Sequence, residues 1–123
     1  PDLYRAILEG VTFEMRYNME KLSEGNVSIN RLLACGGGAR SPVWLQIKAD
    51  ILGCGIIPVQ QGETGAMGSA ILGLSAVLGE SPLKLAEGFW RYAEPVRPNP
   101  EHQAIYHQRY QLYKQLRAFY KEI

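Results

Sequence analysis

Apolar residues near the N-terminus recur every three to four positions, which is the period of an amphipathic α-helix. Asp2 stands where a residue can cap this helix, and Gly25 stands where a C′ glycine would end it. Gly10, in the middle, predicts a close backbone neighbour, because glycine weakens a helix interior. Two apolar stripes predict a helix covered on two sides. They consist of Leu3, Ile7, Val11, Met15 and Leu22, and of Ala6, Gly10, Phe13 and Tyr17.

Two short apolar runs lack helical length and predict strands instead. The run INRLLAC, residues 29–35, lies between turn residues and is typical of a buried strand. The run GIIPVQ, residues 55–60, predicts a second strand. Its Pro58 has no backbone donor for a sheet, so we expect an edge position or an irregular end there.

A helix between these strands is indicated by its start and stop signals. Ser41 is a favourable N-cap, and Pro42 follows at the first helical position, where a missing amide costs nothing. Gly53 is the expected stop. Strand, helix and strand within about 30 residues predict a right-handed parallel crossover unit.

The segment from Glu63 to Gly79 predicts a further helix. Its uncharged part, Thr64 to Gly79, has 16 residues, which is too short to span a membrane, so we expect a core helix. Gly65, Ser69 and Gly73 lie four apart and predict the close approach of another element. Glu63 would complement the helix dipole and act as a cap.

The rest of the chain predicts a short helix, an irregular proline-rich crossing and a long final helix. Asn99 and Pro100 give this last helix a cap and a proline start. The expected buried side of the final helix carries Ile105, Leu112, Leu116, Phe119 and Ile123, with several tyrosines near it.

The balance of elements indicates an α/β protein with strands missing. Two short strands are few for so much apolar helix surface, because each layer must bury its face on another. The chain begins with Pro1 rather than methionine. We therefore expect residues 1–123 to be the C-terminal portion of a larger α/β protein.

Charge narrows the range of partners. The net charge is +1, from 13 basic and 12 acidic residues that are mixed along the chain. Such a balance provides no electrostatic footprint for nucleic acid or for an anionic membrane surface. Small-molecule partners are therefore favoured over both.

The two cysteines, Cys35 and Cys54, belong to no CxxC or Cys/His pattern that could hold zinc. We interpret both as reduced, buried residues. Asp2, Arg5 and Glu9 interrupt any apolar signal-peptide core, so the expected location is the cytoplasm.

The junction ACGGGARSP places Gly36, Gly37 and Gly38 between the first strand and the following helix. Helix amides converge at the end of a parallel strand, and glycines leave room there for a nucleotide, with the Ser41 hydroxyl beside it. A tight turn that needs positive φ is the alternative, and one or two glycines would satisfy it. The residues alone leave both interpretations open.

Two specific glycine motifs do not fit this junction. Ser41 stands where a dinucleotide fingerprint has its third glycine, and Gln60 and Gln61 end the second strand in place of the ribose-binding acid. No GK[ST] sequence follows, which excludes the P-loop.

The segments RAILEGVTFEMR, LLACGGGARSPVWLQIKADILGCGIIPV and ETGAMGSAILG together resemble the C-terminal domain of the FGGY carbohydrate kinases, which include xylulose, gluconate, ribulose and glycerol kinases. The resemblance implies an actin-like ATPase fold of the ribonuclease H-like kind, with short parallel strands packed against helices. In that family the second domain holds most of the ATP and the first holds the sugar. Gly36, Gly37 and Gly38 match the adenosine motif, and Ser41 matches a position that often contacts the adenine edge.

The resemblance also implies an ATP-dependent sugar kinase that uses Mg²⁺, with xylulose as the first expectation and gluconate as the second. Its catalytic aspartate and phosphate-binding loops belong to an N-terminal domain upstream of this segment, so the chain alone is expected to be inactive. A homodimer is left open. A non-catalytic nucleotide-binding or oligomerisation module of the same fold is the alternative, and a Rossmann oxidoreductase ranks third.

Other residues that carry chemistry are given structural roles. Trp44 lies one turn into its helix and is expected to pack rather than stack on a base. Asp50 lies at the far end of that helix from the glycines. Glu63 is expected to cap a helix. His102 and His107, five residues apart, do not share a helix face for a metal and are assigned to the surface or to packing.

Overall fold

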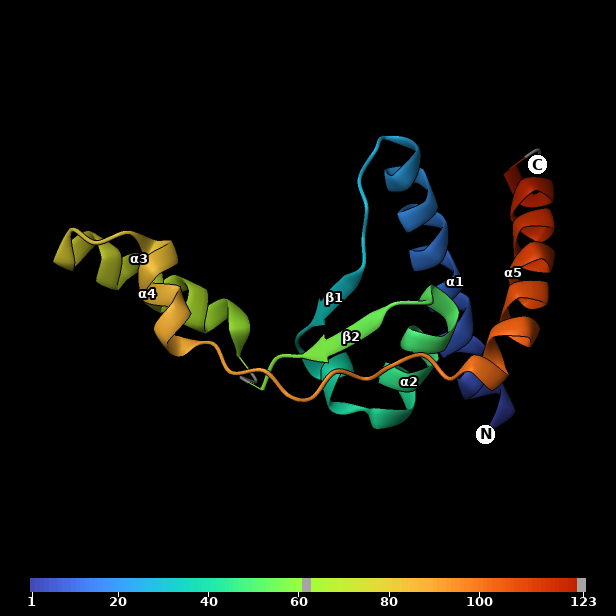
Figure 1. The fold of residues 1–123 in the computed structure, drawn as a ribbon, viewed down its shortest axis with the longest axis horizontal. Coiled ribbons are helices and arrows are strands. Elements are labelled where there is room, and N and C mark those ends of the chain that lie inside the picture. The colour runs from blue at the N-terminus through green and yellow to red at the C-terminus, as the bar shows by residue number, and fades with distance from the viewer. Residues whose placement is uncertain (61–62, 122–123) are drawn as a thin grey trace.

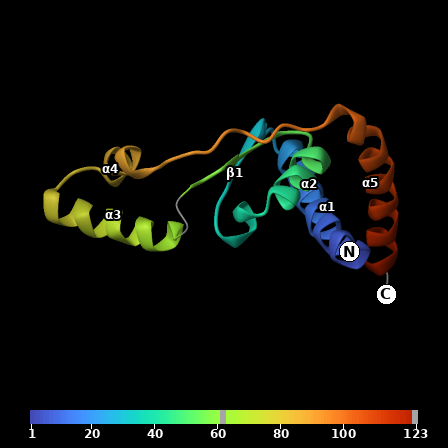
Figure 2. The same cartoon turned by 90° about the horizontal axis from the view of Figure 1, so that it is seen from below.

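The computed structural model describes residues 1–60 and 63–121. Gln61 and Ile123, which entered the expectations above, lie outside the described residues. Helices α1, α2 and α5 gather around a short sheet, and α3 and α4 lie apart from them (Figures 1 and 2). The elements are α1 (Asp2–Glu24), β1 (Arg31–Ala34), η1 (Gly37–Arg40), α2 (Pro42–Leu52), β2 (Gly55–Pro58), α3 (Thr64–Leu78), α4 (Pro82–Phe89) and α5 (Pro100–Lys121).

The two strands are parallel, as the strand–helix–strand pattern predicts. Arg31 pairs with Gly55 at one end of the ladder and Ala34 pairs with Pro58 at the other. Pro58 is the last residue of β2, so its missing donor falls at the irregular end that was expected. Its carbonyl oxygen accepts a hydrogen bond of 2.9 Å from the amide of Ala93 in the crossing segment between α4 and α5.

The expectation of a buried first strand is wrong. Leu32 and Ala34 pack against the side that α2 covers, but Leu33 is 58% exposed. Successive side chains of a strand point to opposite faces, so a helix on one side buries only every second residue.

Helix α2 begins and ends where its sequence signals are. The Ser41 Oγ accepts a hydrogen bond of 3.3 Å from the amide of Trp44, which satisfies one free donor of the first turn. Gly53 ends the helix with φ of 69°, and its amide bonds to the carbonyl of Ala49. Local signals fix this helix at both ends.

Both ends of α1 differ from expectation. Asp2 makes no side-chain cap hydrogen bond and lies inside the first turn, where its charge still complements the helix dipole. At the other end the left-handed residue is Asn26, with φ of 64°, and not Gly25, with φ of −87°. The amide of Val27 bonds back to the carbonyl of Leu22, so Asn26 is the C′ residue of a Schellman motif.

The core lies between α1, α2, α5 and β2, and α1 is covered on one side only. Its buried residues are on the face of Leu8, Thr12 and Phe13, whereas the stripe of Leu3, Ile7 and Val11 remains exposed. No heavy atom lies close to where a Cβ on Gly10 would be, so the expected backbone neighbour is absent from the described residues. The two buried clusters are Leu8, Phe13, Ile47, Ile51, Tyr106 and Tyr110, and Leu45, Ala49, Cys54 and Ile56.

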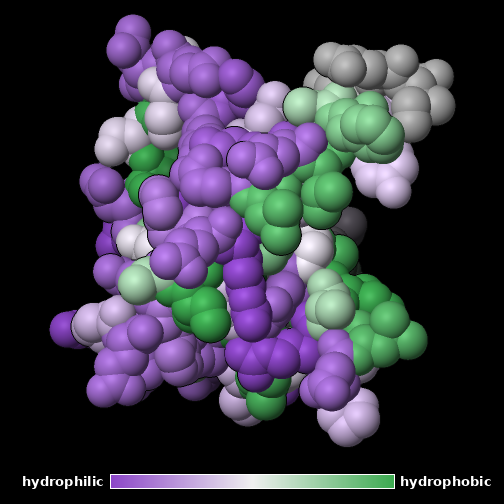
Figure 3. All heavy atoms as spheres, turned by 90° about the vertical axis from the view of Figure 1, so that its right-hand side faces the viewer, coloured by the Kyte–Doolittle hydropathy of each residue, from purple (hydrophilic) through white to green (hydrophobic). Residues whose placement is uncertain are grey.

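Helix α5 packs a face of tyrosines, rather than its aliphatic stripe, against the core. Tyr106 and Tyr110 are buried, and the rings of Tyr110 and Tyr113 stack on Phe13 of α1. The side expected to be buried is exposed, and hydrophobic residues lie at the surface beside hydrophilic ones on this side of the molecule (Figure 3). The exposed residues are Ile105, Leu112, Leu116 and Phe119.

Polar contacts explain why α1 selects the tyrosine face of α5. The buried Glu9 carboxylate accepts hydrogen bonds from the Tyr106 hydroxyl at 2.9 Å and from Arg109 at 3.1 Å. Glu14 accepts two hydrogen bonds from Arg117, each of 3.0 Å. An aliphatic face would offer neither carboxylate a donor from α5, and the buried Glu9 would keep only the hydrogen bond from Arg5 of its own helix.

The expectation of a core helix is wrong for α3. Within α3, Ile71 alone is buried, whereas Leu72 is 63% exposed and Val77 is 82% exposed. Helix α4 is the element packed most closely against it. Nothing lies within 4 Å of where a Cβ on Gly65 or Gly73 would be, so the expected close packing is not present among the described residues. Across those residues, no helix combines the length and apolarity that a membrane crossing requires.

Candidate functional site

The glycine turn, residues 36–41, connects the end of β1 to the first turn of α2. The amide of Val59 bonds to the carbonyl of Ala34 at 2.8 Å and fixes the strand end before the turn. Within the turn, the amide of Ala39 bonds to the carbonyl of Gly36 at 3.1 Å. The turn is therefore a defined piece of backbone at the carboxyl edge of a parallel strand, where open α/β sheets bind ligands.

The structure of the turn itself requires two of its three glycines. Gly36 has φ of +74°, a conformation that side chains disfavour. A Cβ on Gly38 would lie 2.6 Å from Cζ3 of Trp44, which is inside contact distance. A Cβ on Gly37 would meet no atom within 4 Å. The turn alone accounts for Gly36 and Gly38, whereas Gly37 faces open space and has no structural reason within the described residues to lack a side chain.

Ser41 caps α2 with its hydroxyl oxygen, and this role leaves its hydroxyl hydrogen free to donate. Its oxygen accepts the Trp44 amide as the N-cap of α2. The hydroxyl hydrogen is a separate donor, so Ser41 can still donate to an acceptor placed over the turn. The neighbouring Arg40 is exposed.

Trp44 is partly buried and packs against the core, as expected, and it also supports the turn. Its ring lies against the core cluster of α1, α2 and α5, and Nε1 donates a hydrogen bond of 3.4 Å to Oγ1 of Thr12. The opposite side of the ring lies where a Gly38 side chain would be. The position of the turn is therefore tied to the core.

Lys48 is a residue near the turn that sequence reasoning missed. Its Nζ lies 4.0 Å from the centroid of the Trp44 ring and 3.4 Å from where a Cβ on Gly38 would be. Burial lowers the pKa of the Lys48 ammonium. The spacing of four residues from Trp44 is the signal that could have found it, since such residues share a helix face.

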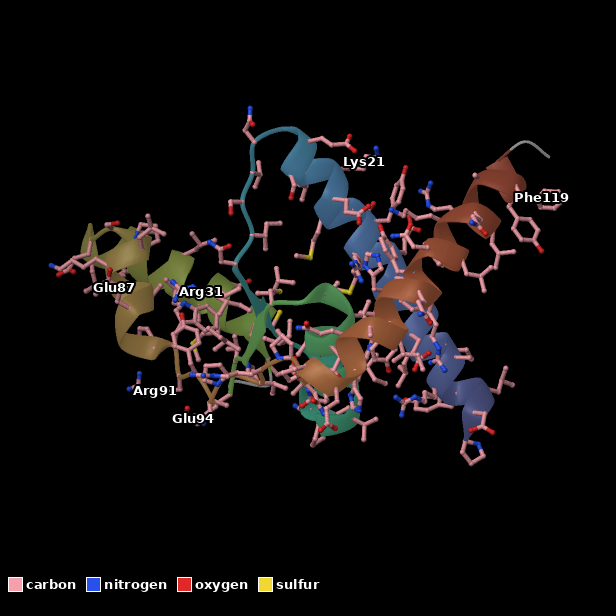
Figure 4. The ribbon with its side chains drawn as sticks, turned by 45° about the vertical axis from the view of Figure 1, so that its right-hand side comes forward. Lys21, Arg31, Glu87, Arg91, Glu94 and Phe119 are labelled. Carbon is pink, nitrogen blue, oxygen red and sulfur yellow. The ribbon has the colours of Figure 1, made fainter. Side chains whose placement is uncertain are left out.

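An apolar hollow of about 320 Å³ lies on the side of the sheet that α2 does not cover. Cys35, which precedes the glycine turn, lines it and is exposed, so the expectation that both cysteines are buried holds only for Cys54. On the side of the sheet away from α5, Figure 4 also shows the charged Arg31, Arg91 and Glu94. The residues that line the hollow are Leu33, Cys35, Val59, Thr64, Trp90 and Tyr92.

Asp50 lies at the end of α2 away from the turn and holds the start of α5. Its buried carboxylate accepts hydrogen bonds of 2.8 Å from Gln46 and 2.7 Å from the backbone amide of Asn99. His102, assigned to the surface or to packing, contacts the same carboxylate through Nδ1 at 2.8 Å. This partnership was not foreseen, because it joins residues 52 positions apart.

Neither the acids nor the histidines form a metal centre within the described ranges. No group of three or more His, Cys, Asp and Glu side chains lies close enough together to hold an ion there. Glu63 occupies the N-cap position of α3, but its side chain makes no cap hydrogen bond, so the capping part of its expected role is wrong.

The sequence profile of the C-terminal domain of the FGGY family of carbohydrate kinases matches residues 1–77, which include β1, the glycine turn, α2 and β2. The chain belongs to the FGGY family of carbohydrate kinases. The resemblance found in the sequence is thereby confirmed, and the glycine turn lies inside the region that carries it.

Relatives within the FGGY family match nearly the whole chain. A probable L-xylulose kinase of Pasteurella multocida is 34% identical over 114 residues, covering 93% of this chain and 23% of that protein. The xylulose kinase of Bacillus subtilis is 33% identical over 123 residues, covering 97% of this chain and 24% of that protein. The chain thus spans about a quarter of the length of these relatives.

Solved FGGY kinase structures share the fold. A xyloylose kinase from Brucella ovis superposes with a TM-score of 0.84 at 33% identity, over 98% of this chain and 25% of that one. A xylulose kinase from Rhodospirillum rubrum gives 0.78 at 27% identity, over 95% of this chain and 24% of that one. The predicted α/β fold class, with short parallel strands packed against helices in the C-terminal part of such kinases, is confirmed.

Proposed function

We propose that residues 1–123 form the ATP-binding part of a carbohydrate kinase that transfers the γ-phosphate of ATP to a sugar hydroxyl. The observation that carries this proposal is the open space beside Gly37, in a turn whose other two glycines have structural reasons. A nucleotide lying on this turn would occupy the volume that a side chain at position 37 would fill.

Each residue of the turn would have a separate role in binding ATP. Gly36 sets the backbone direction, Gly37 leaves its peptide groups accessible to the nucleotide, and Gly38 leaves room for the Trp44 ring that supports the turn. Ser41 would donate its free hydroxyl hydrogen to an acceptor on the base. When bound, MgATP supplies the phosphoryl group, and we expect the Mg²⁺ ligands and the catalytic base to come from residues outside this chain.

The length of the relatives and the surface of the chain support a further domain as the main partner. The chain covers about a quarter of the length of its FGGY relatives. Its α3 helix exposes apolar residues such as Leu72 and Val77, which is the kind of surface that a neighbouring domain covers. We place the sugar in an N-terminal domain that closes on this one. A homodimer and a cytoplasmic location remain predictions.

The names of the relatives support xylulose as the first sugar to test. Several are xylulose kinases, and one solved structure with the same fold is described as a gluconate kinase from Lactobacillus acidophilus. Gluconate is therefore the second substrate to test. The two sugars can be separated with the full-length protein in an assay that couples ADP release to NADH oxidation.

The substitution Gly37→Val in the full-length protein tests the position of the nucleotide. The added isopropyl group would enter the space proposed for ATP, so the KM for ATP should rise by at least about tenfold while the KM for the sugar changes little. Gly88→Val, in the exposed α4 helix, is the matched control, because a Cβ there also meets no atom within 4 Å.

Two results would count against the proposal. Unchanged ATP kinetics in Gly37→Val would show that the nucleotide lies elsewhere. Nucleotide binding by the full-length protein without phosphoryl transfer to any sugar would favour a non-catalytic module of the same fold.

A further inference from the structure

Lys48 differs from the other lysines whose side chains the structure describes. Lys21, Lys84 and Lys114 each lie within 4.0 Å of a carboxylate, at 2.7, 3.4 and 3.6 Å respectively. Among the described side chains, Lys48 has no such partner. Its ammonium lies instead over the face of Trp44, 4.0 Å from the ring centroid.

The position of this cation is fixed by the glycine turn. The Trp44 ring lies against Gly38 on one side, and the Lys48 ammonium is 3.4 Å from where a Cβ on Gly38 would be. An alanine at position 38 would therefore displace both side chains. The absence of a side chain on Gly38 lets a cation lie directly beside the backbone that we propose for nucleotide binding.

A half-buried ammonium without a counter-ion is unfavourable, because burial removes part of its hydration. The lowered pKa of Lys48 is the consequence of this burial. An anion beside the turn would reverse the effect, because an opposite charge a few ångströms away favours the charged form. Phosphate groups are such anions, and lysine binds them as a compact point charge.

We propose that the Lys48 ammonium binds a phosphate group of the nucleotide held on the glycine turn. This inference rests on the proposed function, and it goes beyond it by naming a side chain of α2 as a phosphate-binding residue. The Trp44 ring positions the lysine, and Gly38 gives it access to the turn.

Equilibrium binding of adenosine, AMP and ADP to the full-length protein, measured by calorimetry, separates the phosphate contact from the base contact. In Lys48→Met, the methionine can still cover Trp44, but the charge is lost. The dissociation constants of ADP and AMP should rise by about tenfold or more, while that of adenosine should stay within about twofold. Lys48→Arg should retain most of the affinity for ADP, because it keeps a cation at the same place.

Lys84→Met is the matched control, because Lys84 lies on α4 and is paired with Glu80. It should leave all three dissociation constants unchanged. Raising the salt concentration should weaken ADP binding more in the wild-type protein than in Lys48→Met, because screening acts on the charge that the variant lacks.

Three outcomes would overturn the inference. Unchanged ADP affinity in Lys48→Met, with weakened affinity in Gly37→Val, would leave the nucleotide site in place and remove Lys48 from it. Equal weakening of adenosine and ADP would show that Lys48 acts only through the packing of Trp44. A wild-type protein that binds no ADP, or binds it unaffected by Gly37→Val, would overturn the proposed function together with this inference.

Discussion

Helix α3 has no charged residue from Thr64 to Leu78, yet Ile71 is the one residue of this helix that is buried. The helices α1 and α5 are rich in charged residues, and Tyr110 is completely buried between them. We refer to α1, β1, α2, β2 and α5 as the body, and to α3 and α4 as the arm (Figure 1). The contrast shows that apolar composition does not decide burial by itself. A helix is buried where a complementary partner exists, and for α3 the described residues supply little beyond α4.

The same contrast bears on the candidate site. The glycine turn belongs to the body, and its shape follows from contacts within the body, namely Ser41 with Trp44 and Trp44 with Gly38. The arm exposes apolar surface that its own contacts do not cover. The floor of the proposed nucleotide site is therefore set inside this chain, whereas the described residues do not cover the apolar surface of the arm.

The largest expected difference between body and arm comes from truncating a buried aliphatic side chain in each. Ile51→Ala should lower the free energy of unfolding by about 2 to 5 kcal/mol, because Ile51 is 1% exposed and its loss leaves a cavity. Leu72→Ala, on α3, should change it by less than about 0.5 kcal/mol, because Leu72 is already exposed. Chemical denaturation of the chain measures both. Equal losses would contradict the division into body and arm.

The next largest effect is expected from the acid that holds α5. Asp50→Ala should cost about 3 kcal/mol, because Gln46, the amide of Asn99 and His102 all lose their acceptor. Glu63→Ala is the matched change in the arm and should cost less than about 0.5 kcal/mol, since Glu63 makes no cap hydrogen bond. The account fails here if denaturation gives Asp50→Ala a cost as small as that of Glu63→Ala.

Two serines at N-cap positions provide a smaller test. Ser41→Ala should destabilise the chain by about 1 kcal/mol, because the Trp44 amide loses its acceptor. Ser81 stands at the N-cap of α4 without a side-chain cap hydrogen bond, so Ser81→Ala should change stability by only a few tenths of a kcal/mol. Thermal or chemical denaturation of the pair compares the caps directly, and a reversed order would contradict the assigned hydrogen bonds.

The reaction rates of the two cysteine thiols test how exposed each side chain is. Cys35 is exposed, whereas Cys54 is buried and burial raises the pKa of its thiol, so less reactive thiolate forms at a given pH. A thiol reagent at pH 8 should modify Cys35 at least about tenfold faster than Cys54, and the variants Cys35→Ser and Cys54→Ser identify which thiol has reacted. Similar rates would show that the strand end beside the glycine turn is covered.

Local signals predict part of this fold, and partner selection decides the rest. Helix α2 could be predicted at both ends because Ser41, Pro42 and Gly53 act on their own neighbours. The buried faces of α1 and α5 could not, because each helix carries two apolar stripes. The choice between them depends on polar contacts such as Glu9 with Tyr106, which join residues 97 positions apart.

The candidate site divides in the same way. The glycine motif identified the turn and linked it to the family, but the sequence could not say which glycine is open. That distinction requires the φ of Gly36 and the position of the Trp44 ring against Gly38. Lys48 escaped notice because a lysine on a helix is ordinarily solvated, and only the fold places it beside the turn.

The most direct test of the central claim is a crystal structure of the full-length protein with a non-hydrolysable ATP analogue. The account predicts that the nucleotide lies in contact with the backbone of Gly37, within hydrogen-bonding reach of the Ser41 hydroxyl. A structure in which other protein segments cover the glycine turn and the analogue is bound elsewhere would contradict it.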